Sequence, residues 1–487
     1  MTAVPSSLLR DLSALLGPKG LISDADRAPY ERGYRYGAGR AAALIRPADV
    51  DQLRSVIRYC HAQDIRFFAQ GANTGLVGAS TPDDSEEQIL ISLGHMTAIE
   101  TLDPLDRSMT VQAGARLSAI NAAAAPHDLF FPIDLGADPS IGGMVATNTG
   151  GSRMMRYGDV RRNLLGLEVV LPDQDATLLS NLTGLRKDNS GLDWKHLFVG
   201  TSGAFGLVTR ARIELHAVPR RTAAALVVPQ TQAAVPHIIG LLENALGDSL
   251  TACEGMSRRA MQAAFDHNPA LRRPFGGDIP DYAILVELGT SLSDRIMPDL
   301  DGILVDILGS ACEGPAALVQ DVLFGRAADF WAIRHSISDG VAAMGQVIAF
   351  DISVQRSALP AFRAAAIDLI EREFPQLILC DFGHCGDGGD HFNLVWPNDI
   401  GPAREDRAPM IARLRTALYD LITTEFHGSF SAEHGLGPYN QGFYDRLKSA
   451  PERQLTAAIK DRMDPKNLVG NIRFERGSLS PAPPPTA

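Results

Sequence analysis

Three glycine-rich segments in the first half of the chain constrain the fold more than any other feature of the sequence. They are AQGANTGLVGAS at 69–80, DLGADPSIGGMVATNTGGSRMMRYGD at 134–159 and VGTSGAFGLVTR at 199–210. Glycine permits positive φ angles and lets the backbone approach a bound group closely. Consecutive amides in such loops form anion-binding nests that suit a pyrophosphate. One such segment alone would indicate only tight turns, but three in succession predict a dinucleotide or flavin site.

Length, composition and charge exclude several classes of protein. The 487 residues allow about three domain-sized units. A 45% share of hydrophobic residues and a 21% share of charged ones are typical of a folded globular protein. The net charge of −12 predicts no general attraction to nucleic acid or to an anionic membrane. No apolar stretch reaches the roughly 18 residues of a membrane-spanning helix.

The five cysteines are odd in number and scattered along the chain. This usage is typical of a reducing compartment rather than of a disulfide framework, and we expect a cytoplasmic protein. Charged residues at Arg10 and Asp11 interrupt the N-terminal apolar run, so we expect a short amphipathic helix there and no signal peptide.

Apolar patterns predict an α+β protein whose character changes near residue 220. Strand-like runs lie at 42–46, 65–70, 89–93 and 108–114, and helical spacing follows Pro47. In the second half, strands are expected at 282–288, 346–353 and 376–382, and helices at 357–372 and 404–425. We therefore expect an N-terminal helical segment at 1–36, a first domain at 37–219, a second at 220–475 and a disordered Pro-rich tail at 476–487.

The glycine segments do not follow the common nucleotide-binding patterns. Neither GxGxxG after a first strand nor GxxxxGK[ST] is present, which argues against a Rossmann or a Walker site. Instead, the three segments, with RYGDVRRNLLGLEVVLPD and KDNSGLDWKHLFVGTSGAFGLVT, resemble the FAD domain of the vanillyl-alcohol-oxidase/PCMH flavoproteins. Within that family the motifs are particularly similar to those of the D-2-hydroxyglutarate dehydrogenases and their D-lactate and glycolate dehydrogenase relatives.

The resemblance extends over residues 40–475 and implies a fold of two parts. The first would be a PCMH-type FAD-binding domain of two subdomains. The second would be an α+β substrate (cap) domain of the FAD-linked oxidase C-terminal type. It also implies that Gly71–Gly75 cradle the pyrophosphate and that the backbone near Val208 holds the adenine side. The residues expected to bind FAD are Gln70, Gly71, Ala72, Asn73, Thr74, Gly75, Gly78, Ala79, Ser80, Pro139, Ser140, Gly142, Gly143, Thr147, Asn148, Gly150, Gly151 and Val208.

The chain departs from the family pattern at a few places. Ala72 and Ser202 stand where the family has Gly and Glu, and Gly470–Asn471 stands where Asn-Pro is usual. The first two changes are small enough for a site built from backbone to tolerate. No histidine lies in the two main flavin loops, so we expect FAD to be bound noncovalently.

Histidines and a carboxylate gather in two glycine-rich segments of the second half. CDFGHCGDGGDHFNLVWP at 380–397 carries His384 and His391, and SAEHGLG carries Glu433 and His434. The GDGGD sequence between the first two predicts a hairpin that brings both imidazoles together. Two histidines and one carboxylate form a common Zn²⁺ ligand set. Either histidine alone would indicate only a hydrogen-bonded surface residue, and we expect Cys385 to be packing rather than a ligand.

The same segments resemble the family motifs GHxGDGNxH and SxEHGxG. The resemblance implies that His384, His391 and Glu433 are metal ligands, that His434 is the catalytic base and that Asn393 contacts substrate. In FWAIRHSISDGVAAMGQVIAFDISV at 330–354, Arg334 matches the substrate-carboxylate Arg and Ser338 stands where the hydroxyglutarate enzymes have Thr. Those enzymes carry a Lys where this chain has Ala349, two residues before Asp351.

The resemblance implies FAD-dependent oxidation of a D-2-hydroxy acid to the 2-oxo acid, with D-2-hydroxyglutarate as the leading candidate. We expect metal-assisted deprotonation of the 2-hydroxyl, with His434 accepting the proton, and hydride transfer to flavin N5. D-lactate or glycolate oxidation is the nearest alternative. A zinc-dependent hydrolase is the alternative from another class, and it leaves the glycine segments unexplained. A flavin-binding protein without dehydrogenase activity is a third.

The electron acceptor is not encoded in these motifs. An electron-transfer flavoprotein or a quinone is expected by class, and a homodimer is left open as the assembly.

The glycine segments generate the first testable prediction. The purified protein should be yellow and should release FAD on acid denaturation, because no flavin loop offers a histidine for covalent attachment. Absorbance of the supernatant after acid precipitation measures the release. Flavin that stays with the precipitated protein would contradict noncovalent binding.

Overall fold

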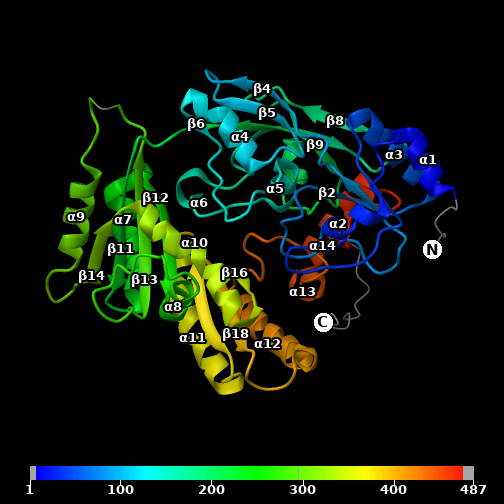
Figure 1. Cartoon of the computed structure of the whole chain (residues 1–487). Helices are drawn as coiled ribbons and strands as arrows, with labels where there is room; N and C mark the ends of the chain where they lie inside the picture. Colours follow the sequence, from blue (N-terminus) through cyan, green and yellow to red (C-terminus); the bar gives the residue numbers. More distant parts are fainter. Residues whose placement is uncertain (1–6, 294, 475–487) are drawn as a thin grey trace. The chain divides into compact units, whose positions relative to one another are not determined.

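The computed structural model describes residues 7–293 and 295–474 and divides into two compact units (Figure 1). Unit 1 contains the chain up to Gly150, then Asp159–Ala217, and the segment from Glu433 onward. Unit 2 contains Gly151–Gly158 and Val218–Ala432. The crossing at Val218 lies beside the junction expected near residue 220. The segment from Glu433, which lies within the second domain predicted at 220–475, is grouped with unit 1 by its contacts. The tail predicted at 476–487 lies outside the described residues.

A small parallel sheet opens unit 1. Its strand order is β1 (Ala43–Ile45), β3 (Ile89–Ser92) and β2 (Phe67–Gln70). The predicted helix after Pro47 is α3 (Val50–Gln63), and α1 (Leu8–Leu16) packs on it with Leu8, Leu12 and Leu16 buried. These strands are almost wholly buried, as short parallel strands are when helices cover them.

An antiparallel sheet of five strands forms the other part of unit 1. Its order is β4 (Ile99–Asp103), β5 (Ser108–Gln112), β9 (Leu207–Glu214), β7 (Leu164–Val170) and β8 (Leu178–Asn181). Helix α5 (Ile141–Thr147) contacts β5 and β9. The smaller elements of the unit are α2 (Ala28–Glu31), α4 (Leu117–Ala124), β6 (Leu129–Phe130), β10 (His216–Ala217), α13 (Gln441–Leu447) and α14 (Ala450–Met463). A two-stranded sheet pairs β6 with β10. The separation of the parallel sheet from the five-stranded one agrees with the predicted two-subdomain arrangement.

Unit 2 is built on one antiparallel sheet of eight strands. The order is β14 (Val319–Gly325), β11 (Arg221–Pro229), β13 (Tyr282–Thr290), β12 (Leu250–Ser257), β17 (Ile378–Gly383), β18 (Gly389–Pro397) and β15 (Gly345–Ile348), and β16 (Asp351–Ser353) also pairs with β18. Strand β12 is buried at every position, and the short helix α6 (Met154–Tyr157) packs on it.

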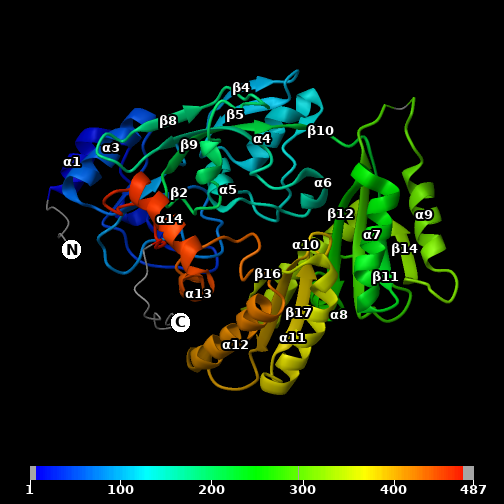
Figure 2. The same ribbon diagram turned by 180° about the vertical axis from the view of Figure 1, so that it is seen from behind.

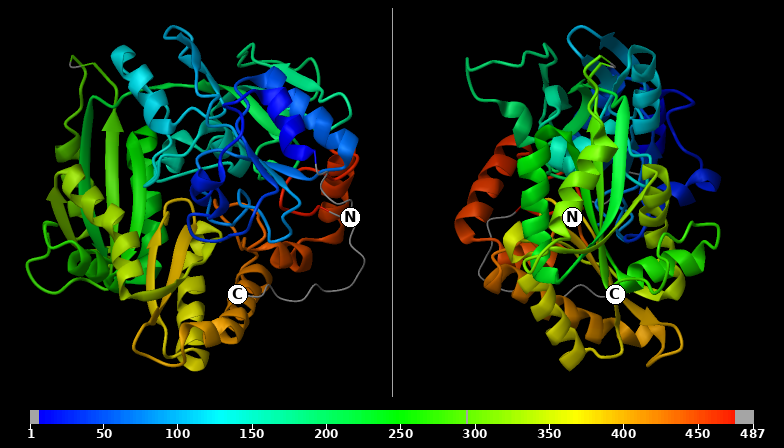
Figure 3. Two further views of the ribbon diagram at one scale, coloured as in Figure 1. Left: turned by 45° about the vertical axis from the view of Figure 1, so that its right-hand side comes forward. Right: turned by 90° about the vertical axis from the view of Figure 1, so that its left-hand side faces the viewer.

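Helices cover both faces of this sheet (Figures 2 and 3). Helices α8 (Arg258–His267) and α10 (Ala327–Met344) pack on one face, where a core joins them to β11, β12, β13 and β17. Helices α7 (Val235–Leu246) and α9 (Leu300–Ala311) contact β11, β12 and β14. Gly340 lets α10 approach α8 closely, since a Cβ there would lie 2.4 Å from the Ala263 carbonyl oxygen. Successive side chains of a strand point to opposite faces of the sheet, so every second residue of β12 faces α10.

Two sequence predictions in this unit need refinement. The strand expected at 346–353 is two short strands, β15 and β16, which both pair with β18. The helix expected at 404–425 is α12 (Ala408–Asp420), with a 3₁₀ turn before it and a π-helical turn at Leu421–Glu425. The helix expected at 357–372 is α11 (Leu359–Glu373). No helix in the described part of the chain is long and apolar enough to cross a membrane.

Candidate active site

The first glycine loop begins where β2 ends and closes on itself. Gln70, the last residue of β2, is buried and donates from Nε2 to the Ser80 carbonyl oxygen at 2.6 Å. Asn73 has φ 55°, and its side-chain oxygen accepts from the Ser80 hydroxyl at 2.9 Å. Within the described residues, the backbone amides of Gly71–Gly75 donate no hydrogen bond. A row of unsatisfied amides held in place is a nest for anionic oxygens such as those of a pyrophosphate.

The second glycine loop enters α5 beside the first one. A Cβ on Gly71 would lie 2.1 Å from the Ser140 Oγ, and one on Gly143 would lie 3.3 Å from the same atom. Ser140 is buried, and among the described residues its hydroxyl has no hydrogen-bond partner. A buried hydroxyl without a partner costs free energy. A polar atom of a bound cofactor would satisfy it, so these residues fit FAD.

The rest of the second loop is held rigidly. Asn148 ends α5 with φ 53°, donates to an Asp159 carboxylate oxygen at 2.7 Å and accepts from the Arg161 amide at 3.0 Å. The Thr147 hydroxyl donates to the Gly143 carbonyl oxygen at 3.1 Å. Predicted FAD residues Pro139, Ser140, Gly142, Gly143, Thr147, Asn148 and Gly150 all belong to this loop and helix in unit 1, whereas Gly151 is assigned to unit 2. Val208 is buried in β9.

The segment that carries Glu433 and His434 packs on the glycine loops of unit 1. The Ser202 hydroxyl, in the third loop, donates to the Leu436 carbonyl oxygen at 2.6 Å. A Cβ on Gly437 would lie 2.2 Å from the carbonyl oxygen of Val77 in the first loop. One on Gly435 would lie 3.9 Å from Thr147 in the second loop. All three glycine loops therefore support this one short segment.

The predicted hairpin is present as β17 and β18, joined by a turn over residues 384–388. His384 lies in the turn and His391 lies in β18, and their ring centroids are 5.2 Å apart. Strand β16 pairs with β18, and in this pairing Asp351 lies opposite His391. Asn393 is buried two residues further along β18, on the same face as His391. Cys385 is buried in the turn.

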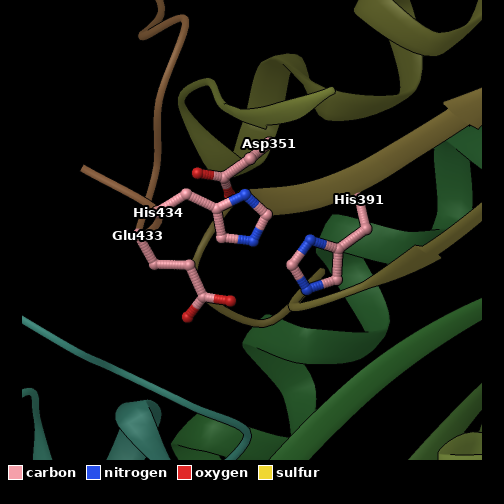
Figure 4. Close-up of side chains that lie close together, drawn as sticks. All are labelled: Asp351, His391, Glu433 and His434. Carbon is pink, nitrogen blue, oxygen red and sulfur yellow. The ribbon is translucent and has the colours of Figure 1, made fainter. Parts of the chain in front are cut away.

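Four ionisable side chains point toward one another at β16 (Figure 4). One ligand atom from each of Asp351, His391, Glu433 and His434 lies within 4.8 Å of those of the others. The Ala432 amide donates to the main-chain oxygen and to Oδ2 of Asp351, at 3.1 and 3.0 Å. Glu433 and His434 follow Ala432 directly, so the chain itself brings them to β16. Oxygen and imidazole donors at this spacing suit a divalent cation.

His384 is not one of these four, and a buried carboxylate accounts for its position. Its Nδ1 lies 2.8 Å from Oε1 of Glu254, and Nε of Arg334 donates to Oε2 of the same group at 2.7 Å. Burial would raise the pKa of Glu254, but the nearby His384 and Arg334 outweigh it and lower the pKa to about 2. Arg334, predicted to hold a substrate carboxylate, therefore has a protein partner at Nε. Ser338 lies one helical turn along α10 and is exposed.

Sequence reasoning missed Glu254 and did not assign a role to Asp351. Both are acidic residues inside otherwise apolar strands, TACEGMS and AFDISV. A charge in the middle of a buried strand is a usable signal, because such a group is rarely buried unless it is paired. Their partners could not be read from the sequence, since Arg334 is 80 residues from Glu254 and His384 is 130 residues away.

Comparisons with known proteins agree with this architecture. The FAD binding domain family matches residues 41–178, and the C-terminal domain of FAD linked oxidases matches residues 218–471. The chain therefore belongs to the FAD-linked oxidases and is an FAD-dependent oxidoreductase, as its motifs predicted.

Curated relatives are similar over most of their length. The chain is 31% identical to a protein of Oryza sativa subsp. japonica named "Probable D-2-hydroxyglutarate dehydrogenase, mitochondrial", covering 94% of this chain and 79% of that one. It is 30% identical to a "Putative D-lactate dehydrogenase C713.03, mitochondrial" of Schizosaccharomyces pombe, covering 95% and 86%. Among solved structures, p-cresol methylhydroxylase with substrate bound matches with a TM-score of 0.70 at 15% identity, over 96% of each chain. That likeness confirms the predicted PCMH-type fold.

Ser140 provides a test of the flavin loops, because its substitution should not lower the stability of the FAD-free protein but should weaken FAD binding. Ser140→Ala should leave the free energy of unfolding of the FAD-free protein unchanged or raise it by about 1 kcal/mol, since no hydrogen bond is lost. It should weaken FAD binding by about 2- to 10-fold, the worth of one hydrogen bond. Urea unfolding and FAD titration of the apoprotein measure the two effects.

The matched control is Ser257→Ala. Ser257 also carries a buried hydroxyl without a partner among the described residues, but it lies in unit 2 at the start of α8. This control should not change FAD affinity. Unchanged FAD affinity in Ser140→Ala would mean that the Ser140 hydroxyl does not contact the cofactor.

Proposed function

We propose that the protein oxidises a D-2-hydroxy acid to the 2-oxo acid, with D-2-hydroxyglutarate as the leading candidate. The observation that carries the proposal is the cluster of Asp351, His391, Glu433 and His434. Two of its members, Glu433 and His434, begin a segment that packs against all three glycine loops. A flavin enzyme that takes a hydride from an alcohol carbon also needs a base for the hydroxyl proton, and this cluster supplies one. The names of the relatives support the substrate class.

A divalent metal, Zn²⁺ by its donor set, is part of the proposal. His391 and Glu433 would hold it with His384 as the third ligand, and the imidazole of His384 lies beside that of His391. His384 would ligate through Nε2, because its Nδ1 faces Glu254. When bound, FAD supplies the hydride acceptor and the divalent ion supplies a Lewis acid near the 2-hydroxyl.

His434 would accept the hydroxyl proton. Its position follows from the loop, since Asp351 binds the Ala432 amide with Oδ2 and with its main-chain oxygen. Because Asp351 already accepts from the Ala432 amide, we propose that it holds the loop and does not ligate the metal. An imidazole suits proton transfer near neutral pH.

Arg334, Ser338 and Asn393 are the proposed substrate contacts. The Arg334 guanidinium would bind a carboxylate, a charge-assisted contact that suits its planar fork. Ala349, where the hydroxyglutarate enzymes have Lys, is buried and contributes no charge. This substitution favours a second candidate, a D-lactate-type substrate without a distal carboxylate, and the name of the Schizosaccharomyces pombe relative supports it.

We further propose an electron acceptor of the electron-transfer-flavoprotein or quinone type, and we leave a homodimer open as the assembly. The cytoplasmic location stays a proposal from cysteine usage. Cys60, Cys253, Cys380 and Cys385 are buried free thiols.

Removal of single cluster residues should separate the metal from the base. Glu433→Ala and His391→Ala should lose the divalent ion and most activity but keep FAD, because the FAD loops are built from other residues. His434→Ala should keep both and lose about 10²- to 10⁴-fold in kcat, the usual worth of general-base catalysis. Metal analysis, flavin absorbance and stopped-flow reduction measure these outcomes. Full activity in metal-free enzyme would reject the metal-assisted mechanism.

The substrate is tested by comparing losses between two acids. Arg334→Ala should reduce kcat/KM for D-2-hydroxyglutarate by about 10- to 150-fold more than for D-lactate, because about 1.5–3 kcal/mol of charge-assisted binding to the distal carboxylate is lost. General damage from breaking the contact with Glu254 affects both substrates and cancels in the ratio. Equal losses would show that Arg334 does not bind the second carboxylate. If wild-type enzyme prefers D-lactate, the second candidate is favoured.

A further inference from the structure

Glu254 is a buried carboxylate that contacts two residues of the proposed site, His384 and Arg334. It lies in the middle of β12 and is 1% exposed. Oε1 faces Nδ1 of His384 at 2.8 Å, and Oε2 accepts from Nε of Arg334 at 2.7 Å. One side chain of the sheet therefore contacts both a proposed metal ligand and a proposed substrate contact.

We propose that Glu254 is a positioning residue that orients His384 for metal binding and Arg334 for substrate binding at the same time. The inference rests on the proposed function and deepens it. All three residues belong to unit 2, so the contacts lie within a single compact body.

On the histidine side, Glu254 selects the ring nitrogen that can ligate. A carboxylate accepts hydrogen bonds and donates none, so Nδ1 of His384 must carry the proton that faces Oε1. The neutral ring then offers the lone pair of Nε2 to a cation. Such carboxylate–histidine–metal arrangements fix the ring and make the ligand more basic.

On the arginine side, Glu254 anchors the guanidinium by one edge. Phe382 lies under it, with the guanidinium carbon 4.6 Å from the ring centroid. Among the described residues, Arg334 donates a hydrogen bond only through Nε. The two terminal nitrogens keep their four N–H groups for a bidentate carboxylate contact, the geometry in which arginine binds most strongly.

The sheet also provides a carboxylate that matches Glu254 in burial but not in partners. Glu287 on the neighbouring strand β13 accepts from the Thr251 hydroxyl at 2.8 Å and from Nε1 of Trp331 at 2.7 Å. Trp331 belongs to α10, as Arg334 does. Glu287 therefore anchors the same helix to the same sheet, but among the described residues it forms no hydrogen bond with a histidine or an arginine.

The test is Glu254→Gln in the full-length FAD-loaded enzyme. Glutamine has one acceptor oxygen, and we expect it to accept from Arg334, because the permanently charged guanidinium is the stronger donor. Its amide N–H₂ would then face His384 and favour the tautomer protonated on Nε2, which cannot ligate. Zinc affinity, measured by competition with a chromophoric chelator, should fall by about 10- to 100-fold, the usual effect of removing such a partner. The flavin spectrum should not change.

Glu287→Gln is the control and should keep wild-type zinc affinity. Zinc affinity of Glu254→Gln equal to that of wild type would overturn the inference and leave the proposed metal site intact. If wild-type enzyme itself binds no zinc, the metal site of the proposed function fails, and this inference fails with it.

A second measurement does not depend on whether Glu254→Gln folds. In metal-free wild-type protein labelled with ¹⁵N-histidine, at a pH well above the usual imidazole pKa, His384 should be protonated on Nδ1 and not on Nε2. Its signal is assigned by its loss in His384→Asn. Protonation on Nε2 instead would overturn the inference.

Discussion

The Ala432 amide makes the contact on which the rest of the site depends. It donates to both the main-chain and a side-chain oxygen of Asp351, and this fixes the chain at β16. Four residues later, the Leu436 carbonyl oxygen accepts from Ser202. A chain spans at most about 3.5 Å per residue. Glu433 and His434 lie between these anchors, so chain length alone keeps the carboxylate and the proposed base near β16, whatever their rotamers.

Two buried cations of this protein, Lys460 and Arg334, are paired with buried carboxylates, and their contacts join separate segments of the chain. Lys460 is 2% exposed, and its Nζ donates to the carbonyl oxygens of Ala204 and Val469 and to Asp464. An ammonium has three donors, so this group is fully satisfied while it ties α14 to the third glycine loop. Arg334 and Glu254 do the same between α10 and β12. Removing one partner of such a pair typically costs about 3–5 kcal/mol, because the other charge stays buried.

Local pattern predicted the elements and the loops, but not their long-range partners. The glycine segments, the hairpin at 384–388 and the helix at Leu359–Glu373 follow from residue type and spacing within a few positions. The division of 346–353 into two strands depends on pairing with β18, which lies about 40 residues away. The partners of Glu254 lie further still along the chain. Sequence spacing carries no information about such contacts, because the sheet order decides them.

The departures from the family pattern differ in whether backbone geometry can absorb them. Ser202 keeps the positive φ of its loop, at 51°, and Gly470 has φ 89°. Asn471 donates from its amide to the Ala79 carbonyl oxygen at 3.3 Å, so the exchanged pair supports the first glycine loop. A cofactor site made of main-chain amides needs only this geometry. Ala349 is different in kind, because a missing ammonium removes a charge that no backbone adjustment restores. We therefore expect substrate choice to depend on that position more than cofactor binding depends on the others.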